Sequence, residues 1–189
     1  MGSGGHANGA EAATAAVKAA MRATPPDLSL QVPFAAASQA VRGLRQSEDG
    51  KTPGTTLVGL SVSPLAAQDG GYRIAFGWIG DSRAWQYGGM LSALTEDHSI
   101  GHVVLRCLGG TAKTSEGDLG PEFGEVIAVP GDVLMLSSDG LHGFVSPPQI
   151  RGVLASGDDP AEMARRLVKL AMDEDTTDNV SVIVGRFGR

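Results

Sequence analysis

Three aspartates stand at the ends of apolar runs and could together bind a metal ion. Asp139 follows the run 133–136, Asp178 precedes the run 180–184, and Asp81 follows the run 74–79. Runs of this length bounded by turn formers are typical of buried strands, and a strand end holds a side chain on a rigid support. Hard divalent cations prefer oxygen ligands such as carboxylates. The sequence therefore predicts that the three aspartates converge on one metal site.

The composition indicates a soluble single domain, residues 1–189, located in the cytoplasm. Hydrophobic residues make up 42% and charged residues 19% of the 189 positions, which is ordinary for a globular protein. The net charge of -6 argues against nucleic acid as a partner, because such sites need clustered Lys and Arg. Cys107 is the only cysteine, which fits a reducing compartment. No stretch approaches the roughly 20 apolar residues of a membrane span, so no membrane partner is expected.

The first half of the chain predicts two helices followed by strands. Residues 10–23 are rich in alanine, and apolar positions recur at helical spacing in 34–45. The strands 55–63 and 72–79 flank a turn at 68–71, and the strands 83–87 and 90–94 flank Gly88-Gly89, so each pair predicts a hairpin. The type of segment 103–108 stays open.

The second half predicts a third hairpin, two helices and a final strand. The strands 123–129 and 133–136 are separated by Pro130-Gly131, and helices are expected at 147–156 and 160–172. Asp159 precedes Pro160 and is the expected N-cap of the longer helix. The last strand is expected at 180–184. Hairpins combined with paired helices indicate an α+β layered fold with antiparallel sheets.

Seven short segments, taken together and in order, resemble the metal-dependent PPM (type 2C) serine/threonine protein phosphatases. They are Gly4-Gly5-His6 with Gly9, Gly54-Thr55-Thr56-Leu57, Gly80-Asp81-Ser82-Arg83, Leu94-Thr95-Glu96-Asp97-His98-Ser99, Leu108-Gly109, Ser138-Asp139-Gly140 and Thr177-Asp178-Asn179. Each segment alone is a weak signal, but the ordered set spans most of the chain. The family resemblance implies a two-layer antiparallel β-sandwich flanked by helix pairs.

The resemblance also implies a chemistry. Family members use two Mn²⁺ or Mg²⁺ ions to activate a water that attacks phosphorus, so no catalytic residue is expected beyond that water. Asp139 and Asp178 match the aspartates that hold one ion, and Asp81 matches the aspartate of a further, weaker ion. Gly2 matches a glycine whose backbone carbonyl contacts the second ion. The implied substrate is a phosphoprotein, with a role in signalling.

The chain departs from the family pattern at its start. Met1 stands where the family has an aspartate that bridges both metals, and the family's first strands, with a phosphate-binding arginine, have no counterpart. Two carboxylates bind a divalent ion weakly, so one loosely held ion and little catalysis are expected. The sequence is then either a fragment of a longer enzyme or a shortened member. A missing strand would also expose a sheet edge and promote self-association.

Other interpretations of the same residues remain open. Residues 2–5 could be a flexible tail, and Asp139 and Asp178 could be turn caps. His98 more often caps a turn than binds a metal, and Arg83 is expected to have a structural role. The alternative function is a catalytically inactive module that binds a phosphoprotein or a partner domain. Dependence on Mn²⁺ or Mg²⁺ separates the two functions.

Overall fold

The computed structural model describes residues 9–25, 27–44, 53–66, 70–101, 103–109 and 120–188. Gly2 lies outside these residues. The chain forms two units, each with its own core: the first comprises Met1–Ser61, Ala75–Asp81 and Asp97–Gly124, and the second comprises Val62–Ile74, Ser82–Glu96 and Glu125–Arg189. The single domain expected from the sequence stays a prediction.

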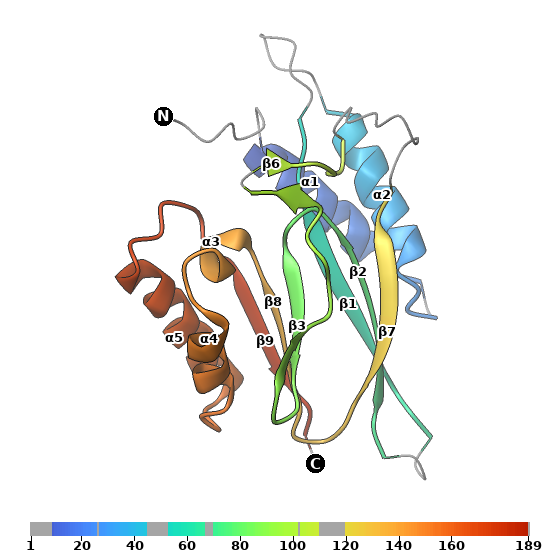
Figure 1. Ribbon diagram of the computed structural model, residues 1–189. Helices are drawn as coiled ribbons and strands as arrows, with labels where there is room; N and C mark the ends of the chain where they lie inside the picture. Colours follow the sequence, from blue (N-terminus) through green and yellow to red (C-terminus); the bar gives the residue numbers. More distant parts are fainter. Residues whose placement is uncertain are drawn as a thin grey trace. The chain divides into compact units, whose positions relative to one another are not determined.

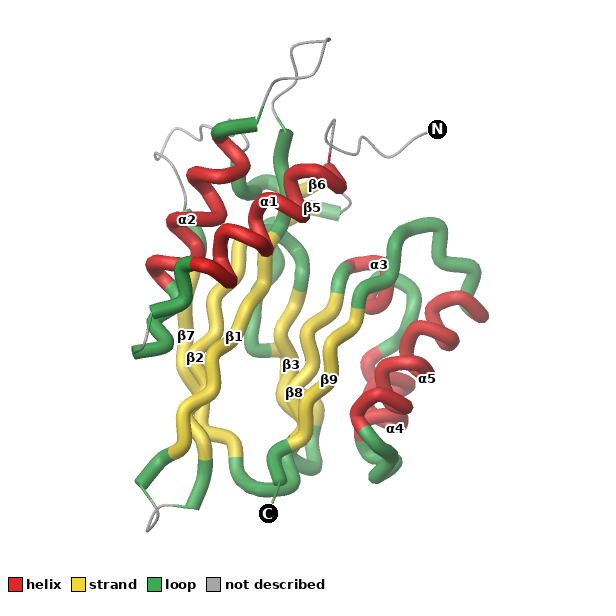
Figure 2. Tube along the Cα trace, turned by 180° about the vertical axis from the view of Figure 1, so that it is seen from behind, coloured by secondary structure: helices red, strands yellow, loops and turns green. Residues whose placement is uncertain are grey.

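Two helices form the core of the first unit. Helix α1 (Gly9–Arg22) and helix α2 (Gln31–Arg42) lie side by side (Figures 1 and 2). They pack through small and apolar side chains onto the strand residue Ile79; the buried set is Ala12, Ala16, Leu30, Phe34, Ala37, Val41, Ile79 and Leu108. Helix α2 begins three residues before the predicted start because Pro33 falls in its first turn, where proline costs no hydrogen bond. It also ends three residues early, at Arg42, with Gly43 as its C-cap.

Strands β1 (Leu57–Pro64), β2 (Tyr72–Ile79) and β7 (Glu122–Ala128) form a three-stranded sheet in the order β1-β2-β7. The predicted pairing of 55–63 with 72–79 is confirmed. Each of the three strands contributes residues to both units. Segment 103–108, whose type the sequence left open, begins with strand β6 (Val103–Val104), which pairs antiparallel with β5 (Ser99–Ile100).

The second unit is built on a four-stranded antiparallel sheet in the order β4-β3-β8-β9. Its strands are β3 (Arg83–Tyr87), β4 (Leu91–Ala93), β8 (Val133–Ser137) and β9 (Val182–Arg186). The predicted hairpin across Gly88-Gly89 is confirmed, with Trp85 opposite Ala93. The α+β class with antiparallel strands is thus confirmed.

Helices α4 (Pro147–Leu154) and α5 (Pro160–Asp173) lie next to each other beside β9 (Figures 1 and 2). Apolar residues from β3, β8 and the helices form one core: Trp85, Val133, Met135, Leu141, Val145, Ile150, Val153, Leu154, Met163, Leu167 and Ala171. The Asp159 carboxylate accepts a hydrogen bond from Ala161 N–H at 2.9 Å, as expected of the N-cap. The predicted helix 147–156 ends two residues early.

The predicted third hairpin, 123–129 with 133–136, is wrong. Strand β7 pairs with β2, whereas β8 lies between β3 and β9 in the other sheet. The turn itself forms, and Gly131 takes a positive φ of 102°. However, Gly131 N–H donates to Phe187 O and Phe187 N–H donates to Asp132 O, both at 3.0 Å. The end of β9 therefore takes the hydrogen bonds that a hairpin would have given to β7.

Two boundaries near the predicted metal site also differ from expectation. The last strand is Val182–Arg186 rather than 180–184, and a one-turn helix, α3 (Asp139–His142), follows β8 where a turn was expected. Ser138 N–H still donates to Ser181 O, but Thr176 and Asn179 hydrogen-bond to Gly140 and Ser138 instead of extending the ladder further. These contacts decide where β9 begins.

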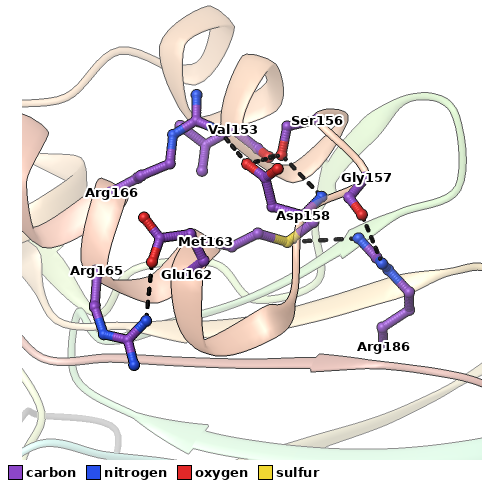
Figure 3. Close-up of polar contacts among 9 residues, drawn as sticks. All are labelled: Val153, Ser156, Gly157, Asp158, Glu162, Met163, Arg165, Arg166 and Arg186. Carbon is purple, nitrogen blue, oxygen red and sulfur yellow. Dashed lines mark hydrogen bonds and ion pairs between the residues drawn. The ribbon is translucent and has the colours of Figure 1, made fainter.

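Arg186, the last residue of β9, anchors the connection between α4 and α5 (Figure 3). Its Nη1 donates to Gly157 O at 3.1 Å, and its Nη2 lies 3.9 Å from Met163 Sδ. Asp158, in the same connection, pairs with Arg166 and accepts a hydrogen bond from Ser156 Oγ at 2.8 Å. The start of α5 is thereby fixed to the sheet.

Candidate metal centre

Asp139 is the first residue of α3 and follows directly on β8. The buried apolar residues of β8 end at Ser137, and Ser138 has an extended backbone (φ −78°, ψ 166°) at the N-cap position. The Asp139 side chain is exposed, and its Oδ1 accepts a hydrogen bond from Gly140 N–H at 3.0 Å. A buried strand thus delivers an exposed carboxylate, as the sequence predicted.

Asp178 lies in the loop between α5 and β9. It is exposed, and its Oδ1 accepts a hydrogen bond from the backbone N–H of Asn179 at 2.7 Å. Each of the two aspartates is therefore oriented by the N–H of the residue that follows it.

The loops that carry Asp139 and Asp178 are joined to each other. Ser138 N–H donates to Ser181 O at 3.0 Å, which continues the ladder between β8 and β9 by one pair. Gly140 is buried against the other loop: a Cβ at this position would lie 2.4 Å from Asn179 O. Only glycine permits this approach of the two backbones.

Asp81, the third predicted ligand, is a half-buried residue of the first unit and follows β2 through Gly80. Gly80 has a φ of 103°, and a Cβ there would lie 2.2 Å from Thr56 Cγ2. The turn that presents Asp81 therefore requires glycine. The structure does not bring Asp81 together with Asp139 and Asp178 within either unit, so the convergence of all three stays a prediction.

His98 holds the Gly80–Asp81 turn in place. Its ring Nδ1 accepts a hydrogen bond from Gly80 N–H at 3.2 Å, and its backbone N–H donates to Gly80 O at 2.9 Å. The proton of the neutral ring must then sit on Nε2, which faces Glu122 Oε1 at 3.2 Å. Arg106 binds the same carboxylate oxygen at 2.6 Å, and the Trp78 ring stacks on the imidazole. These contacts agree with the turn-capping role expected for His98.

We expect the stability of the fold to decrease below pH 6.5 because of His98. Burial and, next, the Arg106 guanidinium hold the pKa of His98 below its ordinary value of 6.5. The unfolded chain therefore binds a proton that the folded chain resists, so stability is complete above pH 6.5 and declines as the pH falls below it. Urea titrations between pH 7.5 and 5.5 would measure this decline.

His98→Asn is the matched variant, because Asn Oδ1 can still accept from Gly80 N–H but does not titrate in this range. It should show a shallower decline below pH 6.5. An equally steep decline in this variant would assign the effect to other groups.

The chemistry of Asp139 and Asp178 fits a hard divalent cation such as Mn²⁺ or Mg²⁺. Both are exposed carboxylates on joined loops, and oxygen ligands completed by water suit these ions. Among the described residues, no group of three or more His, Cys, Asp or Glu side chains is arranged to hold a metal. Gly2, the fourth predicted ligand, lies outside the described residues.

Two kinds of residue around this centre were not predicted from the sequence. Thr176 and Ser138 use their hydroxyls to join the two loops, although only Ser138 appeared in a motif. A Thr two positions before an Asp is a local turn signal that could have indicated Thr176. The second kind is a buried group beneath α3: Ser137 Oγ accepts from Trp85 Nε1 at 3.0 Å and lies 2.9 Å from His142 Nδ1. Only the pairing of β3 with β8 brings these residues together.

The chain is similar in sequence to bacterial protein phosphatases. The protein phosphatase PhpP of Streptococcus pneumoniae is 30% identical over 161 residues, which are 77% of this chain and 63% of PhpP. The chain thus spans less than two thirds of the length of such curated relatives. No family model matches it.

Solved structures show the same fold. PppA, described as a key regulatory component of the type VI secretion system (T6SS) in Pseudomonas aeruginosa, has a TM-score of 0.77 and 28% identity, over 99% of this chain and 83% of PppA. The serine/threonine phosphatase PstP of Mycobacterium tuberculosis has a TM-score of 0.78 and 26% identity, over 98% of this chain and 85% of PstP. A structure of the PstP catalytic domain contains two manganese ions, with a TM-score of 0.81, 26% identity and coverages of 98% and 84%.

Proposed function

Because the chain belongs to the PPM (type 2C) family of protein phosphatases, we propose that it hydrolyses phosphoserine and phosphothreonine in proteins with the help of Mn²⁺ or Mg²⁺. The observation that carries the proposal is the joined pair of loops that presents Asp139 and Asp178 as exposed carboxylates. The resemblance to PstP, whose catalytic domain binds two manganese ions, supports a metal at this place.

Asp139 and Asp178 would hold the ion through their carboxylate oxygens. A bound divalent cation supplies a Lewis acid that activates water for attack on phosphorus and offsets the negative charge of the phosphate. The chain's own part is to orient the two carboxylates. Gly140 N–H and Asn179 N–H do this by donating to Oδ1 of Asp139 and Asp178 respectively.

The remaining predicted ligands belong to the same proposal. Asp81 would contribute to a further, weaker ion, and the backbone carbonyl of Gly2 would contact a second ion. The rigid Gly80 turn, held by His98, supports a ligand role for Asp81, because a metal ligand must be kept in one orientation.

The test is the hydrolysis of a phosphothreonine peptide by residues 1–189 at increasing Mn²⁺ concentrations. We expect slow turnover that depends on Mn²⁺ and stops when a chelator removes it, because one loosely held ion supports little catalysis. If the folded chain shows no metal-dependent turnover, the alternative applies: a catalytically inactive module that binds a phosphoprotein or a partner domain. Binding of the same peptide that is unchanged by chelator would support that module.

The proposed partner is therefore a phosphoprotein in a signalling process, in the cytoplasm. No helix within the described part of the chain has the length and apolar character to cross a membrane.

Self-association through an exposed sheet edge is a further part of the proposal. Among the described strands, β9 pairs only with β8, so it has one edge without a partner strand, and its Ile183 side chain is 68% exposed. Unpaired strand edges of this kind can pair with a second chain. Light scattering should show an average mass that rises with protein concentration. A constant monomer mass at all concentrations would contradict this expectation.

A further inference from the structure

We propose that the hydroxyl groups of Thr176 and Ser138 are positioning groups that cross-brace the two metal-binding loops and set the affinity of the site. The inference rests on the metal-binding part of the proposed function. It concerns two side chains that would not touch the ion, and it adds a reason why the two aspartates act as one site.

The first brace runs from the Asp178 loop to the Asp139 loop. Thr176 Oγ1 donates a hydrogen bond to Gly140 O at 3.1 Å, and Gly140 is the residue after Asp139. The same oxygen accepts from Asp178 N–H at 3.4 Å. One hydroxyl therefore contacts the backbone of both metal-binding segments.

The second brace runs in the opposite direction. Ser138 Oγ donates to Asn179 O at 3.1 Å, and Asn179 is the residue after Asp178. Ser138 Oγ also accepts from Ser181 N–H at 3.0 Å. Each loop thus supplies a hydroxyl to the carbonyl that follows the aspartate of the other loop, and each hydroxyl is used as donor and acceptor.

The two bonded carbonyls need these donors because the backbones meet closely at Gly140. An added Cβ at residue 140 would lie 2.4 Å from Asn179 O, so this carbonyl lies directly against the Gly140 backbone. Removing the Thr176 hydroxyl would leave the part-buried Gly140 carbonyl without its donor, and the loops would separate to hydrate it. The ion would then have to bring the carboxylates of Asp139 and Asp178 back together, and its affinity would fall.

Residues that orient metal ligands in this way typically contribute ten- to a hundredfold to affinity. We therefore expect Thr176→Val, which keeps the shape of the side chain and removes the hydroxyl, to weaken Mn²⁺ binding roughly tenfold. Thr176→Ser keeps the hydroxyl and should bind Mn²⁺ within about twofold of the unaltered chain. Ser156→Ala is the control, because it removes a hydroxyl that bonds Val153 O and Asp158 in the α4–α5 connection.

The affinity is measured by the electron paramagnetic resonance signal of free Mn²⁺, with no substrate present. A loss in Thr176→Val that Thr176→Ser restores and Ser156→Ala lacks would support the inference, since a general loss of stability would not follow this pattern. Equal Mn²⁺ affinity in Thr176→Val and the unaltered chain, both folded by circular dichroism, would overturn it.

Amide hydrogen exchange without metal separates this inference from the proposed function. In Thr176→Val, exchange should accelerate in 138–141 and 176–181 but not in α4 or the middle of α5. Unchanged exchange in the two loops would refute the cross-brace whatever the metal does. If the unaltered chain binds no Mn²⁺, the proposed function fails, and the exchange result alone decides whether the hydroxyls position the loops.

Discussion

Asp139→Asn should lower Mn²⁺-dependent hydrolysis of a phosphothreonine peptide by roughly a thousandfold, because a bound metal stabilises the transition state by several kcal/mol. Asparagine retains an Oδ1 that can accept from Gly140 N–H, so the local backbone should be preserved. What is lost is the negative charge, and neutral amide oxygens bind Mn²⁺ and Mg²⁺ less strongly than carboxylates. Initial rates at several Mn²⁺ concentrations would measure the change.

Asp173→Asn is the matched control for Asp139→Asn. It removes the same charge from an exposed aspartate at the end of α5, where Asp173 pairs with Lys169 at 2.6 Å. Surface ion pairs of this kind contribute little to stability, so the control should keep both fold and turnover. Equal turnover in Asp139→Asn and in the control would show that Asp139 is not a metal ligand.

Gly140→Ala is expected to destabilise the second unit by about 3 kcal/mol, because the added methyl group meets a backbone atom and breaks hydrogen bonds when the loops separate. The Cβ would lie 2.4 Å from Asn179 O and 2.9 Å from Asn179 C. A backbone cannot turn away as a flexible side chain can. The loss would be measured by urea denaturation, and Mn²⁺ affinity should fall in the same variant.

Gly152→Ala provides the opposite case in the same unit. Gly152 lies in α4, is exposed, and has no atom within 4 Å of an added Cβ. Alanine in a helix interior is favoured over glycine by about 0.5–1 kcal/mol, so this variant should gain stability. If Gly140→Ala were as stable as Gly152→Ala, this result would contradict the close approach of the two loops at Gly140.

The elements that depend on local pattern could be predicted from the sequence alone. The helical periodicity of α1 and α5, the Asp159 cap, and the turn residues of two hairpins act over a few positions, so they could be predicted without knowing the partners. The same holds for the position of Asp139 just after a buried strand, whereas Asp178 lies in a loop four residues before β9. The family resemblance, which depends on ordered motifs rather than on packing, is confirmed as well.

Contacts between distant segments determine which strands share a sheet and how the loops of the two aspartates are joined. The turn at Pro130-Gly131 is compatible with a hairpin, but the strand edge offered by β9 takes the available hydrogen bonds. Likewise, Ser138 and Asn179 are 41 positions apart, and nothing in either local segment encodes their hydrogen bond. Local patterns fix backbone preferences within a few residues, whereas pairing depends on which donors and acceptors remain open once distant segments meet. The hydrogen bonds that cross-brace the metal-binding loops form only when these distant segments come together.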